Sequence, residues 1–308
     1  MLTRFQSNLK YKKYGLRQTV WNMAVCFLDR MMKKRKNIKR KNTKRKSGNT
    51  RLKRKTRITK RGKCILAVLC AVLLVVTTAF AIAQGNKPRR SPNVLLNMDK
   101  DIVQGVDLSY FNGEVDFEEL KSEVDFVILR VGYTGYSNGK INADDNFKEY
   151  IKAANDVGLP VGVYYYSQAT NKSEAKAEAK FVLRHIKKYD VSLPVFFDFE
   201  FAEKDGERVG RLHEEGLNAT ENTEIVNEFC KIIADDGYDY GVYASSSVLS
   251  NDLNTKELDE NAYIWVADYN KKVTYSGKYN LWQYSNTGRL NSVSNGERDV
   301  DLNYWYIK

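Results

Sequence analysis

Two carboxylates, Asp198 and Glu200, lie in the otherwise apolar stretch PVFFDFE at residues 194–200. The stretch is typical of a strand that is buried on both faces. Because strand side chains alternate in direction, both acids point to the same side, with Cα atoms roughly 6.5–7 Å apart. Two like charges on one buried face are costly unless a partner, a proton or a chemical role compensates. We therefore expect a division of labour in which one of the two acids holds a proton and the other lacks one.

Further acids fall at the ends of other predicted strands. Asp107 lies in GVDLS, Asp268 closes IWVAD, and Asp299 and Asp301 lie in DVDLN. Acids at the C-terminal ends of parallel strands converge on one mouth of a barrel. Clustered carboxylates without histidine fit two chemistries, which are binding of a hard cation through oxygen ligands and glycoside hydrolysis with one protonated and one ionised carboxyl. Loss of activity with a chelator would identify the cation-dependent alternative.

The aromatic residues near the strand ends favour a sugar over a metal ion. Aromatic rings offer flat apolar faces to sugar rings and polar tips to hydroxyl groups. Many of these rings are expected only to fill the barrel. No His or Cys cluster has metal-ligand spacing, and no P-loop, dinucleotide fingerprint or serine nucleophile elbow is present. We therefore predict neither a metal nor a cofactor. The rings in question are Tyr110, Tyr133, Tyr136, Tyr164, Tyr166, Tyr243, Trp265, Tyr269, Trp282 and Tyr284.

The elements that must position these residues alternate along the chain. Helices are predicted between the earlier strands, at 116–123, 144–158, 173–189 and 220–237, with Ser173 and Thr220 as expected N-caps. Short apolar strands alternating with helices predict a parallel sheet covered by helices. Five such units followed by three strands predict an α/β fold, an irregular TIM-like (β/α)5β3 barrel over residues 102–308. The strands are predicted at 102–109, 125–132, 161–167, 194–200, 240–245, 263–268, 280–285 and 299–305.

The net charge of +12 is unevenly distributed along the 308 residues. Residues 1–63 hold 24 of the 50 Lys/Arg and one of the 38 acids, which leaves 26 basic and 37 acidic residues for the rest. The 20 residues at 64–83 carry no charge and would span ~30 Å as a helix, the thickness of a bilayer core. Positive charge upstream predicts a cytoplasmic N-terminus. We predict a disordered basic cytoplasmic tail at 1–63, a transmembrane signal-anchor at 64–84, a linker at 85–101 and an extracellular domain.

Two alternatives stay open for this N-terminal region. AFAIAQ offers small residues in A-x-A spacing, so the apolar segment could instead be a cleaved signal peptide. The long tail before it favours an uncleaved anchor. The basic tail is expected to adhere to anionic lipid; nucleic-acid binding is the less favoured alternative because aromatic interleaving and a folded motif are missing. The protein is thus expected in the cell membrane as a single-pass protein with its domain on the cell-wall side.

An ordered set of motifs resembles glycoside hydrolase family 25, the cell-wall lysozymes or N-acetylmuramidases of the Chalaropsis type. The motifs are GVDLSYFNGEVDFEELK, DFVILRVGYTGYSNGK, PVFFDFE, YGVYAS, LWQYS and VDLNYW, and the resemblance covers residues 103–308. It implies a barrel of five β/α units and three strands that cleaves the β-1,4 bond between N-acetylmuramic acid and N-acetylglucosamine in peptidoglycan. By motif, Glu200 would be the general acid and Asp198 would assist through the acetamido group. Asp107 and Asp301 would shape the electrostatics of the cleft.

Seven residues are our candidate substrate contacts, and the nucleophile stays open between a carboxylate and the acetamide of the substrate. No wall-binding repeats are recognised, and a membrane anchor is expected to hold the enzyme near the wall. The charged stretch 203–218 is expected to form a loop at the rim of the cleft. The alternative function is a non-catalytic peptidoglycan-binding or assembly protein on a degenerate barrel. The seven candidates are Tyr133, Tyr164, Tyr166, Trp265, Tyr269, Trp282 and Gln283.

Overall fold

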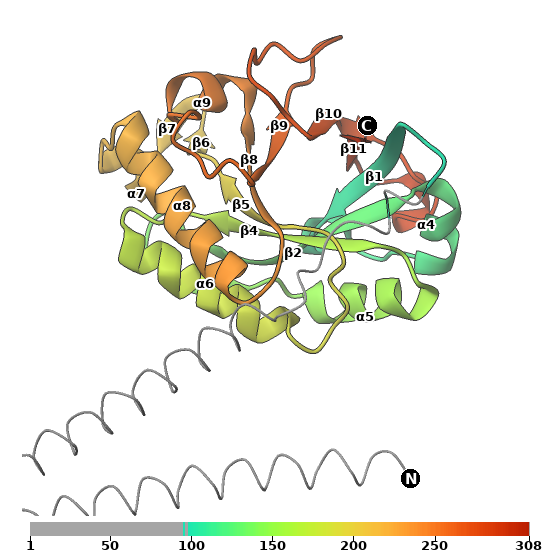
Figure 1. Cartoon of the computed structure of the whole chain (residues 1–308). Coiled ribbons are helices and arrows are strands. Elements are labelled where there is room, and N and C mark those ends of the chain that lie inside the picture. The colour runs from blue at the N-terminus through green and yellow to red at the C-terminus, as the bar shows by residue number, and fades with distance from the viewer. Residues whose placement is uncertain (1–94, 96–97, 308) are drawn as a thin grey trace, which may run out of the picture. The chain divides into compact units, whose positions relative to one another are not determined.

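The computed structural model describes residue 95 and residues 98–307 (Figure 1). The predicted tail at 1–63 and the predicted membrane segment at 64–84 lie outside the described residues, as does most of the predicted linker. Among the described residues, no helix is long and apolar enough to cross a bilayer. Leu95 is buried against the strands of the barrel.

Eight strands close into a barrel because β1 pairs with β2 on one side and with β11 on the other. Neighbouring strands from β1 to β10 run parallel, whereas β11 is antiparallel to both β10 and β1. The predicted α/β barrel-like fold is therefore confirmed. The strands are β1 (Ile102–Leu108), β2 (Phe126–Thr134), β4 (Val161–Ser167), β5 (Val195–Phe199), β8 (Tyr240–Ser245), β9 (Tyr263–Ala267), β10 (Leu281–Gly288) and β11 (Val300–Tyr306).

Helices cover the outside of the barrel and follow the first five of these strands (Figure 1). Each presents an apolar stripe to the strands, as α6 does with Ala175, Ala179, Val182 and Ile186, which are all buried. The fifth helix, α9, has only six residues, so the helical layer is thin over β8 and β9. The helices are α4 (Phe117–Glu123), α5 (Phe147–Val157), α6 (Lys172–Ile186), α8 (Ala219–Asp235) and α9 (Ser246–Asn251).

Two of these helices begin earlier than the sequence predicts. Asn171 caps α6 by accepting a hydrogen bond from the backbone N–H of Glu174, and Asn218 caps α8 in the same way. Ser173 and Thr220, the expected caps, therefore lie inside the first turn. In both helices the observed cap lies two residues before the expected one. The asparagine has the extended backbone conformation that a cap requires.

The alternation of side chains divides the apolar residues between two layers. On β2, Val127, Leu129 and Val131 pack outward against the helices, whereas Phe126 and Ile128 belong to the cluster inside the barrel. Large aromatic rings fill this interior, and glycine makes room for them. A Cβ at Gly105 would lie 2.3 Å from the ring of Phe126. The barrel interior is thus a packed core and not a pore.

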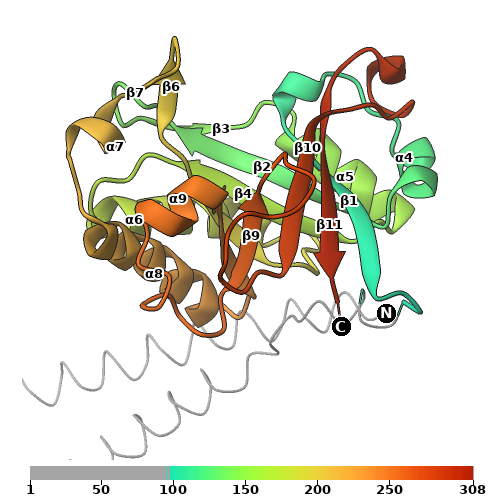
Figure 2. The same ribbon diagram turned by 90° about the horizontal axis from the view of Figure 1, so that it is seen from above.

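Several short elements decorate the ends of the strands. Strand β3 (Ile141–Ala143) adds to the edge of β2, and the hairpin of β6 (Ala202–Lys204) and β7 (Glu207–Val209) projects just after β5 (Figure 2). Helix α7 (Arg211–Glu214) follows this hairpin, so the stretch predicted as a rim loop has regular structure. The 3-10 helices η1 (Tyr110–Asn112) and η2 (Ser294–Gly296) lie in loops after β1 and β10.

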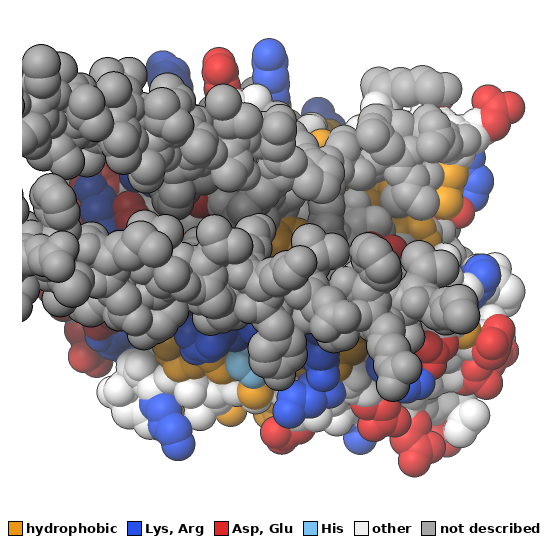
Figure 3. All heavy atoms as spheres, turned by 60° about the horizontal axis from the view of Figure 1, so that its bottom comes forward, with side chains coloured by type: hydrophobic (Ala, Val, Ile, Leu, Met, Phe, Trp, Pro, Cys, Tyr) orange, Lys and Arg blue, Asp and Glu red, His pale blue; other side chains and the backbone are white. Residues whose placement is uncertain are grey.

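The charged side chains show no segregation on the face of the molecule seen in Figure 3. Asp/Glu and Lys/Arg side chains of the described residues are interspersed around the visible part of this face.

Candidate active site

Strand β5 turns its two acids into the barrel. Phe196 belongs to the interior cluster, whereas Phe197 and Phe199 pack outward against the helices. Asp198 has the same parity as Phe196 and is buried, and Glu200 follows directly after the strand. Strand alternation thus brings the two carboxyls of PVFFDFE together at the mouth, as the sequence predicts.

Asp107 and Asp301 meet where the barrel closes. They are register partners on the antiparallel strands β1 and β11. Asp107 is at the C-terminal end of its strand, but Asp301 is at the start of β11. The expectation that all the acids come from the C-terminal ends of parallel strands is therefore wrong for Asp301. Because β11 runs the other way, its first residues lie at the same mouth.

A hydrogen-bond network fixes the carboxyl of Asp107. One oxygen, Oδ2, accepts from Gln283 Nε2 at 2.9 Å and from Asn303 Nδ2 at 2.8 Å. The indole of Trp265 donates to Asn303 Oδ1 at 2.8 Å, which sets the orientation of that amide. The amide oxygen of Gln283 accepts from the hydroxyl of Tyr243 at 2.8 Å. Both amides thus direct their N–H groups at Asp107.

Burial and neighbouring charge raise the pKa of Glu200 toward neutral pH. Burial raises its pKa to about 7, the charge of Asp301 adds to this, and the nearby hydroxyl of Tyr243 opposes it. Burial also raises the pKa of Asp301 to about 6, against a hydrogen bond with Asp107. A carboxylic acid that titrates near 7 is suited to proton donation at neutral pH.

The pKa values of Asp198 and Asp107 are also raised, although Asp198 was expected to be ionised. Burial, and then the charges of Glu200 and Asp107, raise the pKa of Asp198 well above its usual value. Burial and the charge of Asp301 do the same to the pKa of Asp107. The expected ionised Asp198 is therefore opposed by its surroundings before substrate binds. The positive charge of Arg130 is the influence that lowers the pKa of Asp198.

Arg130 is a buried cation that the sequence analysis missed. Its Nε donates to Asp144 Oδ2 at 2.8 Å, and its guanidinium carbon lies 5.0 Å from the ring centre of Tyr110. The rings of Phe111 and Tyr133 lie at 5.1 and 5.4 Å. Arg130 shares the inward parity of Phe126 and Ile128 on β2, and this parity was the signal that could have found it. A charge at that position of a buried strand needs a partner inside the barrel.

Glu200 stands between two pockets at the barrel mouth. A pocket of about 330 Å³ lies toward β8 and β9, where Tyr243, Asp268 and Tyr269 line it. A second pocket of about 460 Å³ lies toward the β6–β7 hairpin, where Tyr166 and Arg208 line it. Both pockets include Glu200, Ser245 and Ser247. A chain-like substrate lying across both would place one of its linkages at the Glu200 carboxyl.

Residues 106–293 match the Glycosyl hydrolases family 25. The chain belongs to this family. An autolytic lysozyme of Clostridium acetobutylicum is 24% identical over 200 residues, which are 65% of this chain and 55% of that protein. Lysozyme M1 of Streptomyces globisporus is 25% identical over 214 residues, covering 67% and 68% of the two chains.

Solved structures show the same barrel. The modular autolysin LytC of Streptococcus pneumoniae, in complex with a synthetic peptidoglycan ligand, is 28% identical, with a TM-score of 0.55 over 67% of this chain and 47% of LytC. A family 25 glycosyl hydrolase of Bacillus anthracis, at 23% identity, shares the fold with a TM-score of 0.54 over 68% of this chain and 91% of its own. This chain spans about half the length of LytC and of the clostridial lysozyme.

The predicted substrate contacts of this family 25 barrel occupy different places. Tyr166 and Tyr269 line the two pockets, and the hydroxyl of Tyr269 also donates to Gln283 at 2.7 Å. Tyr164 and Trp265 pack edge to face inside the barrel, where Trp265 is fully buried. Tyr133 lies beside Arg130.

Trp282, another predicted contact, lies apart from the acids. Its ring packs with Tyr284 and Tyr304 on the outer side of β10, and its indole donates to the carbonyl of Asp268 at 2.6 Å. The carboxylate of Asp268 accepts hydrogen bonds from Ser246 and Thr274 in the surrounding loops. These bonds outweigh the effect of its burial and lower its pKa. These residues shape the loop that carries Tyr269.

Asn303 and Tyr243 join the candidate site, although neither was among the predicted site residues. Asn303 is two residues after Asp301, so strand parity alone turns both side chains into the barrel. Tyr243 was one of the aromatic residues noted in the sequence, and its place between Glu200 and Gln283 depends on the neighbouring strands. Of these two residues, only Asn303 could have been found in the sequence from the alternation of side chains along its strand.

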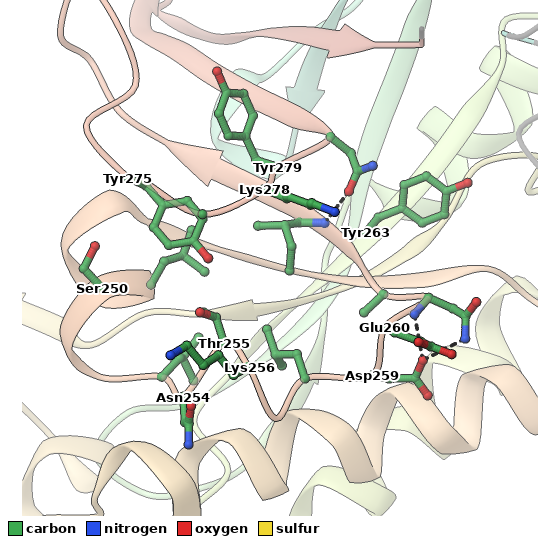
Figure 4. A pocket seen from close by; sticks show the side chains of 18 of the residues that line it. Ser250, Asn254, Thr255, Lys256, Asp259, Glu260, Tyr263, Tyr275, Lys278 and Tyr279 are labelled. Carbon is green, nitrogen blue, oxygen red and sulfur yellow. Dashed lines mark hydrogen bonds between the residues drawn. The ribbon is translucent and has the colours of Figure 1, made fainter.

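A further pocket, of about 1330 Å³, lies elsewhere (Figure 4). It is lined by the loop before β9 and by the loop before β10, including Asp259, Tyr263, Tyr275 and Tyr279. It therefore lies at the opposite ends of these strands from Glu200. None of the carboxylates at the barrel mouth lines it. Among the described residues, no group of three or more His, Cys, Asp or Glu is arranged to hold a metal ion.

Proposed function

We propose that this chain is a cell-wall lysozyme that hydrolyses the β-1,4 bond between N-acetylmuramic acid and N-acetylglucosamine in peptidoglycan. The observation that carries the proposal is Glu200, a carboxyl whose pKa is raised to about 7 and which stands between two pockets. The relatives named lysozyme, and the peptidoglycan ligand bound by LytC, support the substrate.

In this proposal Glu200 is the general acid. Its proton passes to the glycosidic oxygen as the bond to the anomeric carbon breaks, which lets the N-acetylglucosamine side leave as an alcohol. The resulting Glu200 carboxylate then takes a proton from the water that completes hydrolysis. The enzyme regains its proton, and one water has been added across the bond.

Asp198 would assist on the other side of the reacting carbon. Its Oδ1 is buried and finds no hydrogen-bond partner among the described residues. An acetamido N–H of the substrate would supply that partner and favour the ionised form, to which Arg130 already contributes. Asp198 would then serve either as the nucleophile or as the residue that holds the acetamido group for attack by its own oxygen. Asp107 and Asp301 would shape the electrostatic potential of the cleft in which the sugar binds.

We also propose that residues 64–84 anchor the enzyme in the cell membrane with the barrel on the wall side. The charge-free segment and the basic residues before it support this topology. Protease added to intact protoplasts should remove the barrel and leave the tail protected. Release of a soluble protein whose mass begins after residue 83 would instead identify a cleaved signal peptide.

The function is tested by digestion of purified peptidoglycan followed by mass analysis of the products. New reducing ends on N-acetylmuramic acid are expected, and the wild type should act equally well in a chelator. Binding to wall fragments without any new reducing ends would identify the alternative, a non-catalytic wall-binding protein. Loss of activity in the chelator would identify a cation-dependent hydrolase.

A further inference from the structure

Glu200 lies just beyond the support of the sheet. The ladder between β4 and β5 ends with the pair Ser167 and Phe199, and the ladder between β5 and β8 ends at Asp198. The backbone that carries the candidate general acid therefore has no strand partner on either side. Since a misplacement of about 1 Å can lower a rate by about 100-fold, another group must fix this residue.

The side-chain amide of Gln168 takes the place of the missing strand partner. Its Nε2 donates to the carbonyl oxygen of Glu200 at 2.7 Å and to that of Ser167 at 2.9 Å. Both amide hydrogens are therefore used, one on each of the two neighbouring strand ends. Gln168 is fully buried, so water does not compete for these bonds.

Gln168 also fastens the chain where it returns from the β6–β7 hairpin. The chain leaves the barrel after Glu200, forms the hairpin and comes back at Arg211. There Arg211 Nη1 donates to the backbone carbonyl of Gln168 at 2.8 Å, and the same guanidinium binds both oxygens of Glu174 at 2.7 and 2.8 Å. Gln168 thus contacts the chain both where it leaves the barrel, at Glu200, and where it returns, at Arg211. These contacts hold Glu200 in place when the hairpin moves.

The unpaired oxygen of the same amide argues against a merely space-filling role. Gln168 Oε1 is buried and has no hydrogen-bond partner among the described residues. A buried polar atom without a partner destabilises a fold, so this oxygen is a cost that filling the space alone would not require. The two N–H bonds are the feature that only the amide provides.

We propose that Gln168 is a positioning residue for the general acid and that it acts by fixing the backbone of Glu200. The proposal rests on the lysozyme function proposed above. Gln168 touches no substrate in this role. Its loss therefore affects kcat far more than KM, because the pockets keep their walls while the Glu200 carboxyl loses its fixed position.

The test compares Gln168→Met with the control Thr223→Val. Met is similar in length to Gln and removes both amide hydrogens. Thr223 is likewise fully buried and makes two hydrogen bonds away from the barrel mouth: its hydroxyl donates to the carbonyl of Ala219 on α8 and accepts from the backbone N–H of Asn254. Steady-state kinetics on soluble peptidoglycan fragments should give a kcat lowered roughly 10- to 100-fold for Gln168→Met, with KM within about 2-fold. Thr223→Val should keep the wild-type kcat.

A second variant covers the case in which Gln168→Met does not fold. Gln168→Asn keeps a buried amide but is one methylene too short to reach the Glu200 carbonyl, so it should show the same selective loss of kcat. Wild-type kcat in either folded variant overturns the proposal. A kcat that falls only in step with the folded fraction, equally in Thr223→Val, also overturns it.

Titration of the Glu200 carboxyl by NMR tests the positioning role of Gln168 independently of any hydrolytic activity. In protein labelled with ¹³C at glutamate carboxyls, the Glu200 signal is assigned by its loss in Glu200→Gln and titrated between pH 4 and 9. A changed titration midpoint in Gln168→Met, together with an unchanged one in Thr223→Val, supports the positioning role even if the wild type cleaves no peptidoglycan. Superimposable titrations in all three proteins overturn it, whatever the enzyme hydrolyses.

Discussion

Asp301 lies directly opposite Asp107 in the register between the eleventh and the first strand. The charge of Asp301 raises the pKa of Asp107, whereas a hydrogen bond with Asp107 lowers the pKa of Asp301, which burial raises. Because the folded pKa of Asp301 is about 6, above its usual value, this group stabilises the fold fully at low pH. That stability is lost as the pH rises through about 6.

Asp301→Asn should therefore flatten the dependence of stability on pH. The difference between the free energies of unfolding at pH 4 and pH 8 should narrow by roughly 2–3 kcal/mol, because the amide cannot ionise. Urea unfolding at several pH values measures this difference. An unchanged slope would mean that Asp301 ionises as freely in the fold as in the unfolded chain.

Glu200→Gln should remove hydrolysis while the protein stays folded. The amide fills the same space but has no proton to donate, so kcat/KM on purified cell walls should fall by about 100- to 10,000-fold. Glu207→Gln, an exposed change on β7, is the matched control and should retain wild-type activity. Near-normal lysis by the Glu200 variant would remove this residue from the role of general acid.

The activity of the wild type should decline as the pH rises through about 7. Glu200 must hold a proton, and its raised pKa places the loss of that proton there. Tyr243→Phe removes the hydroxyl that lowers the pKa of Glu200, so the basic limb of kcat/KM should move to higher pH. A limb that stays in place, or moves down, would show that another group sets it.

Glu178 should make the stability of the fold depend on pH, although it lies outside the barrel mouth. It is buried on α6, where Thr134 and Ser167 donate to it at 2.5 and 2.6 Å, and burial outweighs these bonds to raise its pKa to about 7. Its stabilising contribution is complete below about pH 4.5 and is lost as the pH rises through 7.

Glu178→Gln should therefore lower stability at pH 5 more than at pH 8, where the wild type must place a charge in the same site. Thermal unfolding at the two values measures the difference between the two melting-temperature shifts. Equal shifts at both values would mean that Glu178 does not titrate between them.

Strand parity within one segment was sufficient to predict half of the candidate site. It placed Asp198 and Glu200 on one side of β5, and the same rule applied to β2 would have revealed Arg130. What the sequence could not give was the direction of a strand relative to its partners. Asp301 reaches the mouth from the start of β11 because that strand closes the barrel in the opposite sense.

Contacts that depend on loops were beyond the sequence for a different reason. The bond from Gln168 to Glu200 joins residues 32 positions apart, and neither residue type nor periodicity marks it. The helix caps show the same limit at short range, because Asn171 and Ser173 are both suited to the role. The backbone conformation of the preceding loop decides between them.

The bond between Asn303 and Asp107 spans 196 positions of the chain, which has a consequence for synthesis. During translation, β1 emerges first and keeps one open edge until β11 has been made. Until then Asp107 has neither its amide partner nor the acid opposite it. A nascent chain from which β11 has not yet emerged therefore cannot carry the finished arrangement of acids, however much of the barrel before it has formed.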